Sequence, residues 1–182
     1  KTMQTTGWQG SIPSLEHNVG EFFNCRFDMY QQLTGLEDGY YLIYVQGFYR
    51  NGGTAEAYEK HAKGTEVLDA VLYGNEDRVD VQSLYEDGAG LGGYNGYSDN
   101  REQAEKDFNH SEGTYANYLI TKVEGGRLKL GLKKVRETLN DWTCFNNFQL
   151  YRLPKVTDIK DVTSRGGACP EAAYDLSGRK WD

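Results

Sequence analysis

The sequence predicts an all-β fold: a two-sheet antiparallel β-sandwich of the jelly-roll type, with short helices in its loops. In several segments apolar residues recur at every second position, which is the period of a half-buried strand. Glycine and other turn-forming residues separate these segments. The chain holds 22 Gly and 14 Tyr among its 182 residues, and only two short segments have a helix-forming composition. A parallel sheet with long crossover helices does not fit this pattern.

The first two strands are predicted on either side of a turn at residues 34–39. Alternation over residues 22–33 gives one face to a set of apolar side chains, namely Phe23, Cys25, Phe27 and Met29. Residues 40–48 are apolar on both faces, as in a central strand that is covered on both sides. The two segments therefore read as a β-hairpin.

The remaining strands are predicted at residues 67–73, 79–84, 115–123, 127–133 and 142–153. Glu124-Gly125-Gly126 favours a tight primed turn between two of them. Thr54 is expected to cap a helix at 55–63, and Asp99 or Asn100 a helix at 101–108. The expected core contains Phe23, Phe27, Ile43, Val45, Leu72, Leu130, Leu150 and either Phe145 or Phe148.

Composition divides the chain at Pro154. Residues 1–154 carry the strand pattern and are long enough to bury one core, so they form one predicted domain. Residues 155–182 are predicted to be a linker and the start of a C-terminal extension, with the polar stretch at 156–172 and a small patterned unit at 173–181.

Charge and apolar runs exclude two classes of partner. The chain has 20 Lys and Arg against 27 Asp and Glu, a formal charge of −7, which argues against nucleic acid. Its apolar runs are too short to span a bilayer, so we expect a soluble chain or one whose leader has been removed. Cys25, Cys144 and Cys169 are too few for a disulfide scaffold. In an exported protein Cys25 could pair with Cys144 or Cys169, although the pattern favours free buried thiols at Cys25 and Cys144.

Catalytic motifs are not visible in the sequence. His17, His61 and His110 have no partner at metal-binding spacing, and no nucleophile elbow is found. Residues 88–93 match G-x-G-x-x-G, but no βαβ unit surrounds them, so a dinucleotide site is rejected. The sequence therefore predicts a protein that is not an enzyme and has no catalytic metal.

Aromatic, amide and guanidinium side chains in loops or at strand ends are the candidates for binding a ligand. They are Tyr49, Arg50, Tyr94, Asn95, Tyr97 and Trp142. Four of them have a structural alternative. The two loop tyrosines could dock on their own scaffold, Trp142 could be a packed strand-end residue, and Arg50 could pair with an acid of the 55–63 helix.

Three segments resemble a known family: residues 27–41, residues 46–50 and Asp141-Trp-Thr-Cys-Phe-Asn-Asn-Phe-Gln-Leu-Tyr151. They are similar to galactose-binding-like β-sandwich domains, akin to carbohydrate-binding modules, of Bacteroidetes surface proteins that degrade glycans. The similarity covers roughly residues 8–153. Residues 174–180 resemble the C-terminal extension of secreted proteins in that phylum, which implies export and a module from the end of a larger protein.

The resemblance implies a non-catalytic module that binds a polysaccharide or oligosaccharide, with a plant cell-wall type polysaccharide as the expected ligand class. It implies fusion to a glycoside hydrolase, and a secreted or cell-surface location. It also implies a structural Ca²⁺ held by Glu16 or Glu21 together with Asn146, at reduced affinity because Asn146 stands where relatives carry Asp. The alternative is a structural or protein-interaction domain packed against the hydrolase.

Overall fold

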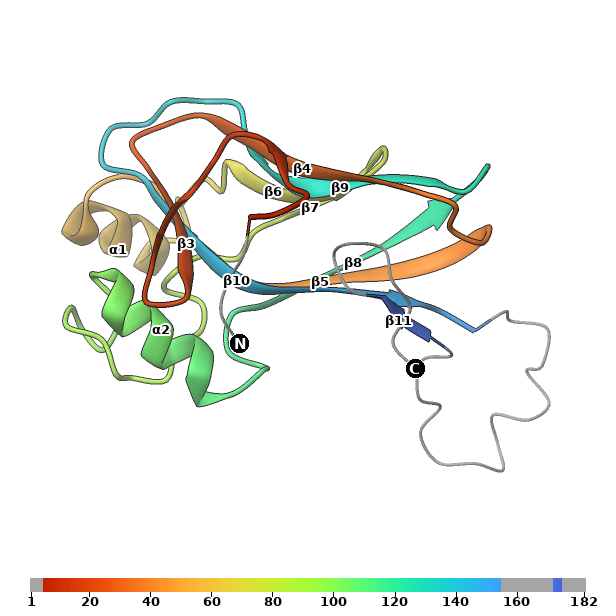
Figure 1. Ribbon diagram of the computed structural model, residues 1–182. Helices are drawn as coiled ribbons and strands as arrows, with labels where there is room; N and C mark the ends of the chain where they lie inside the picture. The colour runs from red at the N-terminus through yellow and green to blue at the C-terminus, as the bar shows by residue number, and fades with distance from the viewer. Residues whose placement is uncertain (1–4, 155–171, 175–182) are drawn as a thin grey trace.

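Two antiparallel sheets face each other across an apolar layer in the computed structural model, which describes residues 5–154 and the strand at 172–174 (Figure 1). The first sheet has the order β1-β4-β9-β6-β7: β1 (Gln9–Gly10), β4 (Phe27–Thr34), β9 (Arg127–Lys134), β6 (Ala70–Gly74) and β7 (Asp77–Asp80). The second has the order β2-β3-β10-β5-β8: β2 (Ser14–Glu16), β3 (Val19–Phe23), β10 (Trp142–Arg152), β5 (Gly39–Arg50) and β8 (Ala116–Val123). The predicted all-β two-sheet sandwich is confirmed.

The inner faces of the two sheets form the main core. Alternation along the strands sends the expected side chains inward, and they are buried: Phe27, Ile43, Val45, Leu72, Leu130, Phe145 and Leu150. Asp28, which alternates with Phe27, stays partly exposed, so the predicted register of this strand is correct.

Phe23 is the exception, and the prediction for it was wrong. The segment 22–33 is not one strand, because β3 ends at Phe23 and β4 begins in the other sheet. Asn24, between them, has a φ of 53° in the left-handed region, which breaks the alternation. Phe22 consequently fills the core, with its ring centroid 4.1 Å from that of Phe27, while Phe23 points outward and is 48% exposed.

The two predicted hairpins also turned out to be crossovers between the sheets. β4 and β5 are consecutive in the chain but lie in different sheets, and so do β8 and β9. Gly125 and Gly126 have φ values of 65° and 68°, the left-handed pair of a primed turn, but only one isolated bridge follows before the strands diverge. The two crossovers lie beside each other, since the Leu36 amide donates to the Gly126 carbonyl over 3.2 Å.

Two helices cover one end of the second sheet on its outer face (Figure 1). They are α1 (Thr54–Ala62) and α2 (Arg101–His110). Thr54 was predicted as a cap but is the first helical residue, and Gly53 occupies the cap position. Under the helices lies a second apolar cluster, which includes Phe48, Phe108, Tyr115, Trp142 and Cys144.

The predicted linker falls almost entirely outside the described residues. Within the extension, β11 (Ala172–Tyr174) pairs with the end of β10 from Leu150 to Arg152, so this short stretch adds to the second sheet. No helix among the described residues has the length and apolar character needed to cross a membrane.

Candidate functional site

Strand register places three of the predicted site residues, Arg50, Trp142 and Glu21, at one end of the second sheet. Trp142, the first residue of β10, lies opposite Phe23 of β3 on one side and Arg50 of β5 on the other. One step further along the same face, Cys144 lies between Glu21 and Phe48. Residues paired directly across antiparallel strands share a face, so these six side chains all point away from the inter-sheet core.

The N-terminus of α2 forms the wall beside this row. The Asn100 side chain caps the helix by accepting from the Gln103 amide over 3.0 Å, and the Gln103 side chain accepts from the Asp99 amide over 2.7 Å. This reciprocal pair is a variant of the capping box, and it fixes the backbone at the start of the helix.

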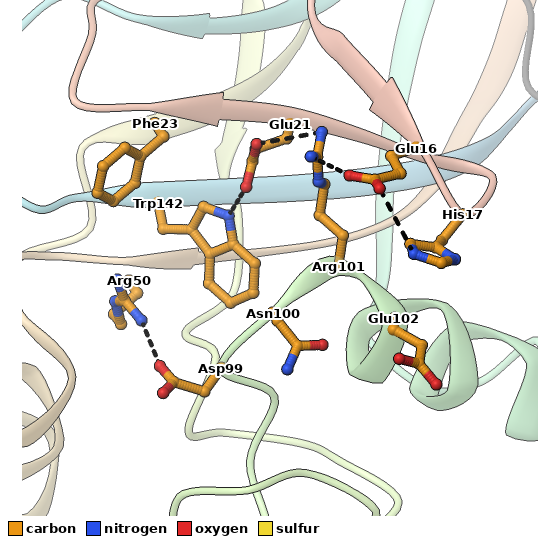
Figure 2. Close-up of a pocket in the computed structure, with 10 residues that line it drawn as sticks. All are labelled: Glu16, His17, Glu21, Phe23, Arg50, Asp99, Asn100, Arg101, Glu102 and Trp142. Atoms are coloured by element: carbon orange, nitrogen blue, oxygen red, sulfur yellow. Dashed lines mark hydrogen bonds and ion pairs between the residues drawn. The ribbon is translucent and has the colours of Figure 1, made fainter.

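A pocket of about 450 Å³ lies between the sheet end and this helix terminus. Its size falls in the range of about 300–1,000 Å³ common for small-molecule sites. Figure 2 shows its lining: Glu16, His17, Glu21, Phe23, Arg50, Asp99, Asn100, Arg101, Glu102 and Trp142. The lining combines aromatic rings, carboxylates, guanidinium groups and one amide.

Arg101 joins the β2–β3 hairpin to the helix. Its guanidinium pairs with Glu16 and with Glu21, the latter over 3.4 Å (Figure 2). It also donates to the Ser14 hydroxyl over 2.6 Å. Glu21 in turn accepts from the Trp142 indole N–H over 2.7 Å. The hairpin wall of the pocket is therefore held by charged contacts.

Arg50 is held as firmly on the other side of Trp142. Its guanidinium donates to the Gly52 and Asn140 carbonyls, to the Thr54 hydroxyl over 2.9 Å and to Asp99 over 3.2 Å. It also lies 5.1 Å from the centroid of the Trp142 ring, a cation–π distance. The sequence alternative of an ion pair for Arg50 is confirmed, but the predicted partner was wrong. The partner is Asp99, which precedes α2, and not an acid of α1.

The two aromatic residues of the pocket differ in exposure. Trp142 is 3% exposed and packs edge-to-face on Phe48, so it forms the floor, as its structural alternative predicted. Phe23 is 48% exposed and stands at the rim. Because we expected Phe23 in the core, sequence reasoning missed the aromatic side chain that is open to a ligand.

Tyr49 is excluded as a contact residue. It was chosen for its place at a strand end, but β5 continues to Arg50, and alternation turns Tyr49 inward between the sheets, where it is 0% exposed. Residues 82–84 also cover this part of the strand through backbone hydrogen bonds with Tyr49. Burial raises the pKa of its phenol well above the ordinary value.

Tyr94, Asn95 and Tyr97 lie on a separate loop, residues 88–98, which we call the tyrosine loop. Tyr94 and Tyr97 exchange backbone hydrogen bonds across a turn in which Asn95 and Gly96 have φ values of 50° and 87°. Neither tyrosine lines the pocket that Arg50 lines. A smaller hollow of about 240 Å³ at this loop is lined by Glu86, Asp87, Gly88, Gly90, Asn95, Gly96 and Tyr97.

The rings of the tyrosine loop contact other tyrosines. Tyr97 meets Tyr85 edge-on at 5.2 Å, and Tyr94 meets Tyr58 of α1 edge-on at 5.8 Å. Both loop tyrosines are partly buried. This geometry supports the self-docked alternative over an open stacking platform beside Arg50.

Replacing Tyr97 with alanine tests that interpretation. We expect Tyr97→Ala to lower the free energy of unfolding by about 1–2 kcal/mol, because it removes edge-to-face contacts and buried ring area. Denaturant unfolding monitored by circular dichroism would measure the loss. An unchanged unfolding curve combined with weaker glycan binding would instead return Tyr97 to the candidate binding residues.

Two of the expected calcium ligands, Glu16 and Glu21, have other contacts, whereas the Asn146 side-chain oxygen has no hydrogen-bond partner in the described part of the chain. Glu21 is engaged by Trp142 and Arg101, and a divalent cation at its carboxylate would be repelled by the guanidinium. The Asn146 side-chain oxygen is buried beside an irregularity of β10. Among residues 5–154 no group of three His, Cys, Asp or Glu side chains is arranged to hold a metal ion. The pairing of both glutamates with Arg101 argues against a calcium ion here, and the calcium site stays a prediction.

The cysteines within the described chain are both free thiols. Cys144 is buried under α2, and Cys25 is partly exposed in the connection between β3 and β4. Burial raises the pKa of the Cys144 thiol well above its usual range, which disfavours a reactive thiolate. Cys169, the other candidate partner of Cys25, lies outside the described residues.

Comparison with known proteins gives no match to a family model, to a curated protein or to a solved structure.

Proposed function

We propose that this domain is a non-catalytic carbohydrate-binding module of a secreted or cell-surface glycan-degrading protein, and that the pocket beside Trp142 is its ligand site. The observation that carries the proposal is the row of side chains Phe23, Trp142 and Arg50 at the sheet end. It offers a sugar ring an exposed aromatic side chain next to fixed polar groups. A plant cell-wall type polysaccharide remains the ligand class that the sequence resemblance favours.

Polar groups of the pocket suit hydroxyl recognition. Asp99 and Glu16 keep about half of their side-chain surface open, at 49% and 52%, although each already contacts a guanidinium group. A carboxylate held in this way can still accept from a sugar hydroxyl with its remaining lone pairs.

Replacing Phe23 with alanine tests this function. We expect Phe23→Ala to weaken oligosaccharide binding roughly five- to ten-fold, because stacking on one ring contributes about 1–1.4 kcal/mol. Stability should change little, since half of the ring is already in water. Affinity gels with a panel of plant polysaccharides, followed by calorimetry with oligosaccharides of the retained polymer, would measure the effect at micromolar to millimolar affinity.

Tyr118→Ala is the matched control. Tyr118 is 55% exposed on the outer face of β8, far along the sheet from the pocket, so its removal should leave glycan binding unchanged. Equal binding by wild type and Phe23→Ala, or retention of the wild type by no polysaccharide, would contradict the proposal.

A second candidate function has its own observation. Tyr40, Tyr118 and Ile120 are each more than half exposed on the outer face of β5 and β8, where register brings them onto one surface. An apolar sheet face of this kind suits packing against an adjoining glycoside hydrolase domain. In that case Ile120→Asp would weaken association with the hydrolase, and Phe23→Ala would have no effect.

A further inference from the structure

We propose that the pocket selects neutral sugar chains and rejects glycans that carry carboxylate or sulfate groups. This inference rests on the proposed function and adds a ligand class to it. It follows from the charges of the side chains that line the pocket and from the hydrogen bonds and ion pairs that the guanidinium groups of Arg50 and Arg101 already make.

Negative side chains outnumber positive ones around the pocket. Four carboxylates line it, from Glu16, Glu21, Asp99 and Glu102, against the two guanidinium groups of Arg50 and Arg101. The chain as a whole carries a formal charge of −7, so the long-range field has the same sign. An anionic ligand entering the pocket meets repulsion from both sources.

Both guanidinium groups are already engaged. Arg50 is only 7% exposed in its side chain, and its donors point at Asp99, Thr54 and two backbone carbonyls. Arg101 pairs with two glutamates and a serine. A uronate or sulfate would have to displace a protein carboxylate from its guanidinium, which leaves that carboxylate unpaired.

The hydroxyl groups of a neutral sugar, unlike a carboxylate or sulfate, find open hydrogen-bond acceptors in the pocket. The open oxygens of Asp99, Glu16 and Glu102 are acceptors, with 49%, 52% and 59% of their side-chain surfaces exposed. Sugar hydroxyls are donors that carry no charge, so they can bind these oxygens without displacing an existing partner. The pocket is therefore rich in acceptors, and a neutral polyol complements it.

The test compares neutral polymers with derivatives whose primary hydroxyls carry carboxylates instead, and the salt dependence isolates the contribution of charge. The full chain is run in affinity gels containing β-1,4-galactan, glucomannan or mixed-linkage β-glucan, and the same polymers after oxidation of their primary hydroxyls to carboxylates. We expect retention by a neutral polymer and roughly ten-fold weaker retention by its oxidised form at low salt, with the difference shrinking at high salt.

Two charge-reversal variants locate the effect. Glu102→Lys changes an exposed residue at the pocket rim, and we expect it to reduce the discrimination several-fold. Glu76→Lys changes the net charge equally but lies in the β6–β7 turn of the opposite sheet, and it should leave most of the discrimination intact.

The outcomes separate this inference from the proposed function. Equal or stronger retention by the oxidised polymers would overturn the neutral selectivity and leave carbohydrate binding standing, as would a Glu102→Lys variant that discriminates like wild type. Retention by neither neutral nor charged polymers would overturn the proposed function, and the inference with it.

Discussion

Replacing Lys134 with methionine is expected to lower the free energy of unfolding by about 3–5 kcal/mol. Lys134 ends β9, and its ammonium pairs with the Asp141 carboxylate and donates to the Arg136 carbonyl over 2.7 Å. Both side chains of the pair are 1% exposed. Methionine fills much of the space but leaves Asp141 as a buried charge without its cation, and that uncompensated charge causes the loss.

The destabilisation should depend on pH in a definite direction. Burial already raises the pKa of Asp141, and the Lys134 ammonium opposes that rise. Without Lys134 the folded-state pKa rises further above the unfolded value of about 3.9, so the folded state holds a proton that the unfolded state releases. The free energy of unfolding of the variant therefore falls as pH rises from the unfolded-state pKa of Asp141 to its higher folded-state pKa. The loss of stability relative to wild type should be smaller near pH 4 than at pH 7.

Urea denaturation of four proteins would measure both effects: wild type, Lys134→Met, Asp141→Leu and the double variant. The double variant removes both charges, and we expect it to lie closer to wild type than either single variant does. A Lys134→Met protein within about 1 kcal/mol of wild type at pH 7 would contradict the expected cost of leaving the Asp141 charge buried without its cation.

Trp142→Ala is the second substitution with a large expected effect, about 3–5 kcal/mol of stability. The indole is 3% exposed, packs on Phe48 and lies against the Arg50 guanidinium. Its N–H also holds Glu21, so the variant would open a cavity and release the hairpin wall of the pocket at the same time. We expect loss of glycan binding together with this loss of stability.

Comparison with Phe23→Ala distinguishes the two aromatic roles. Thermal unfolding and calorimetric binding, measured on both variants, should show a large drop in melting temperature only for Trp142→Ala, whereas both should bind glycan more weakly. If Trp142→Ala melts like wild type, the floor assignment is wrong, and the indole is a ligand platform instead.

Most of the longer strands were predictable from local pattern, but the short β1 and β2 and the partners of the strands were not. Inward residues such as Ile43, Leu72 and Leu130 follow from alternation, because a strand buried on one face needs apolar residues at every second position. Neighbouring strands in the chain were assigned to the same sheet, but the glycine turn at 124–126 connects strands of different sheets. A primed turn sets the backbone conformation of only a few residues. Which strands pair with each other is decided by packing over the whole domain.

The pocket residues were also predictable where local sequence pattern determines their position, and not where tertiary packing does. Arg50 and Trp142 were identified because strand ends and loops commonly carry binding residues. Arg101 gave no sequence signal beyond its place in a short helix, since its role depends on α2 lying against the β2–β3 hairpin. Phe23 was misassigned because a single left-handed residue, Asn24, ends the alternation. Glu21 lies two residues before Phe23 on the same strand, so the two side chains share a face, and the charged Glu21 would have indicated that this face is the outer one.

The strand order has a consequence for how the chain reaches this state during synthesis. β9 lies between β4 and β6, and β10 lies between β3 and β5, so in each sheet a late strand separates two early ones. The first sheet cannot be completed until β9 has been made, and the second cannot be completed until β10 has been made near residue 150, so the central contacts span long stretches of chain. Folding of such a topology is expected to be slow and all-or-none, with unpaired strand edges exposed until the last strand is inserted.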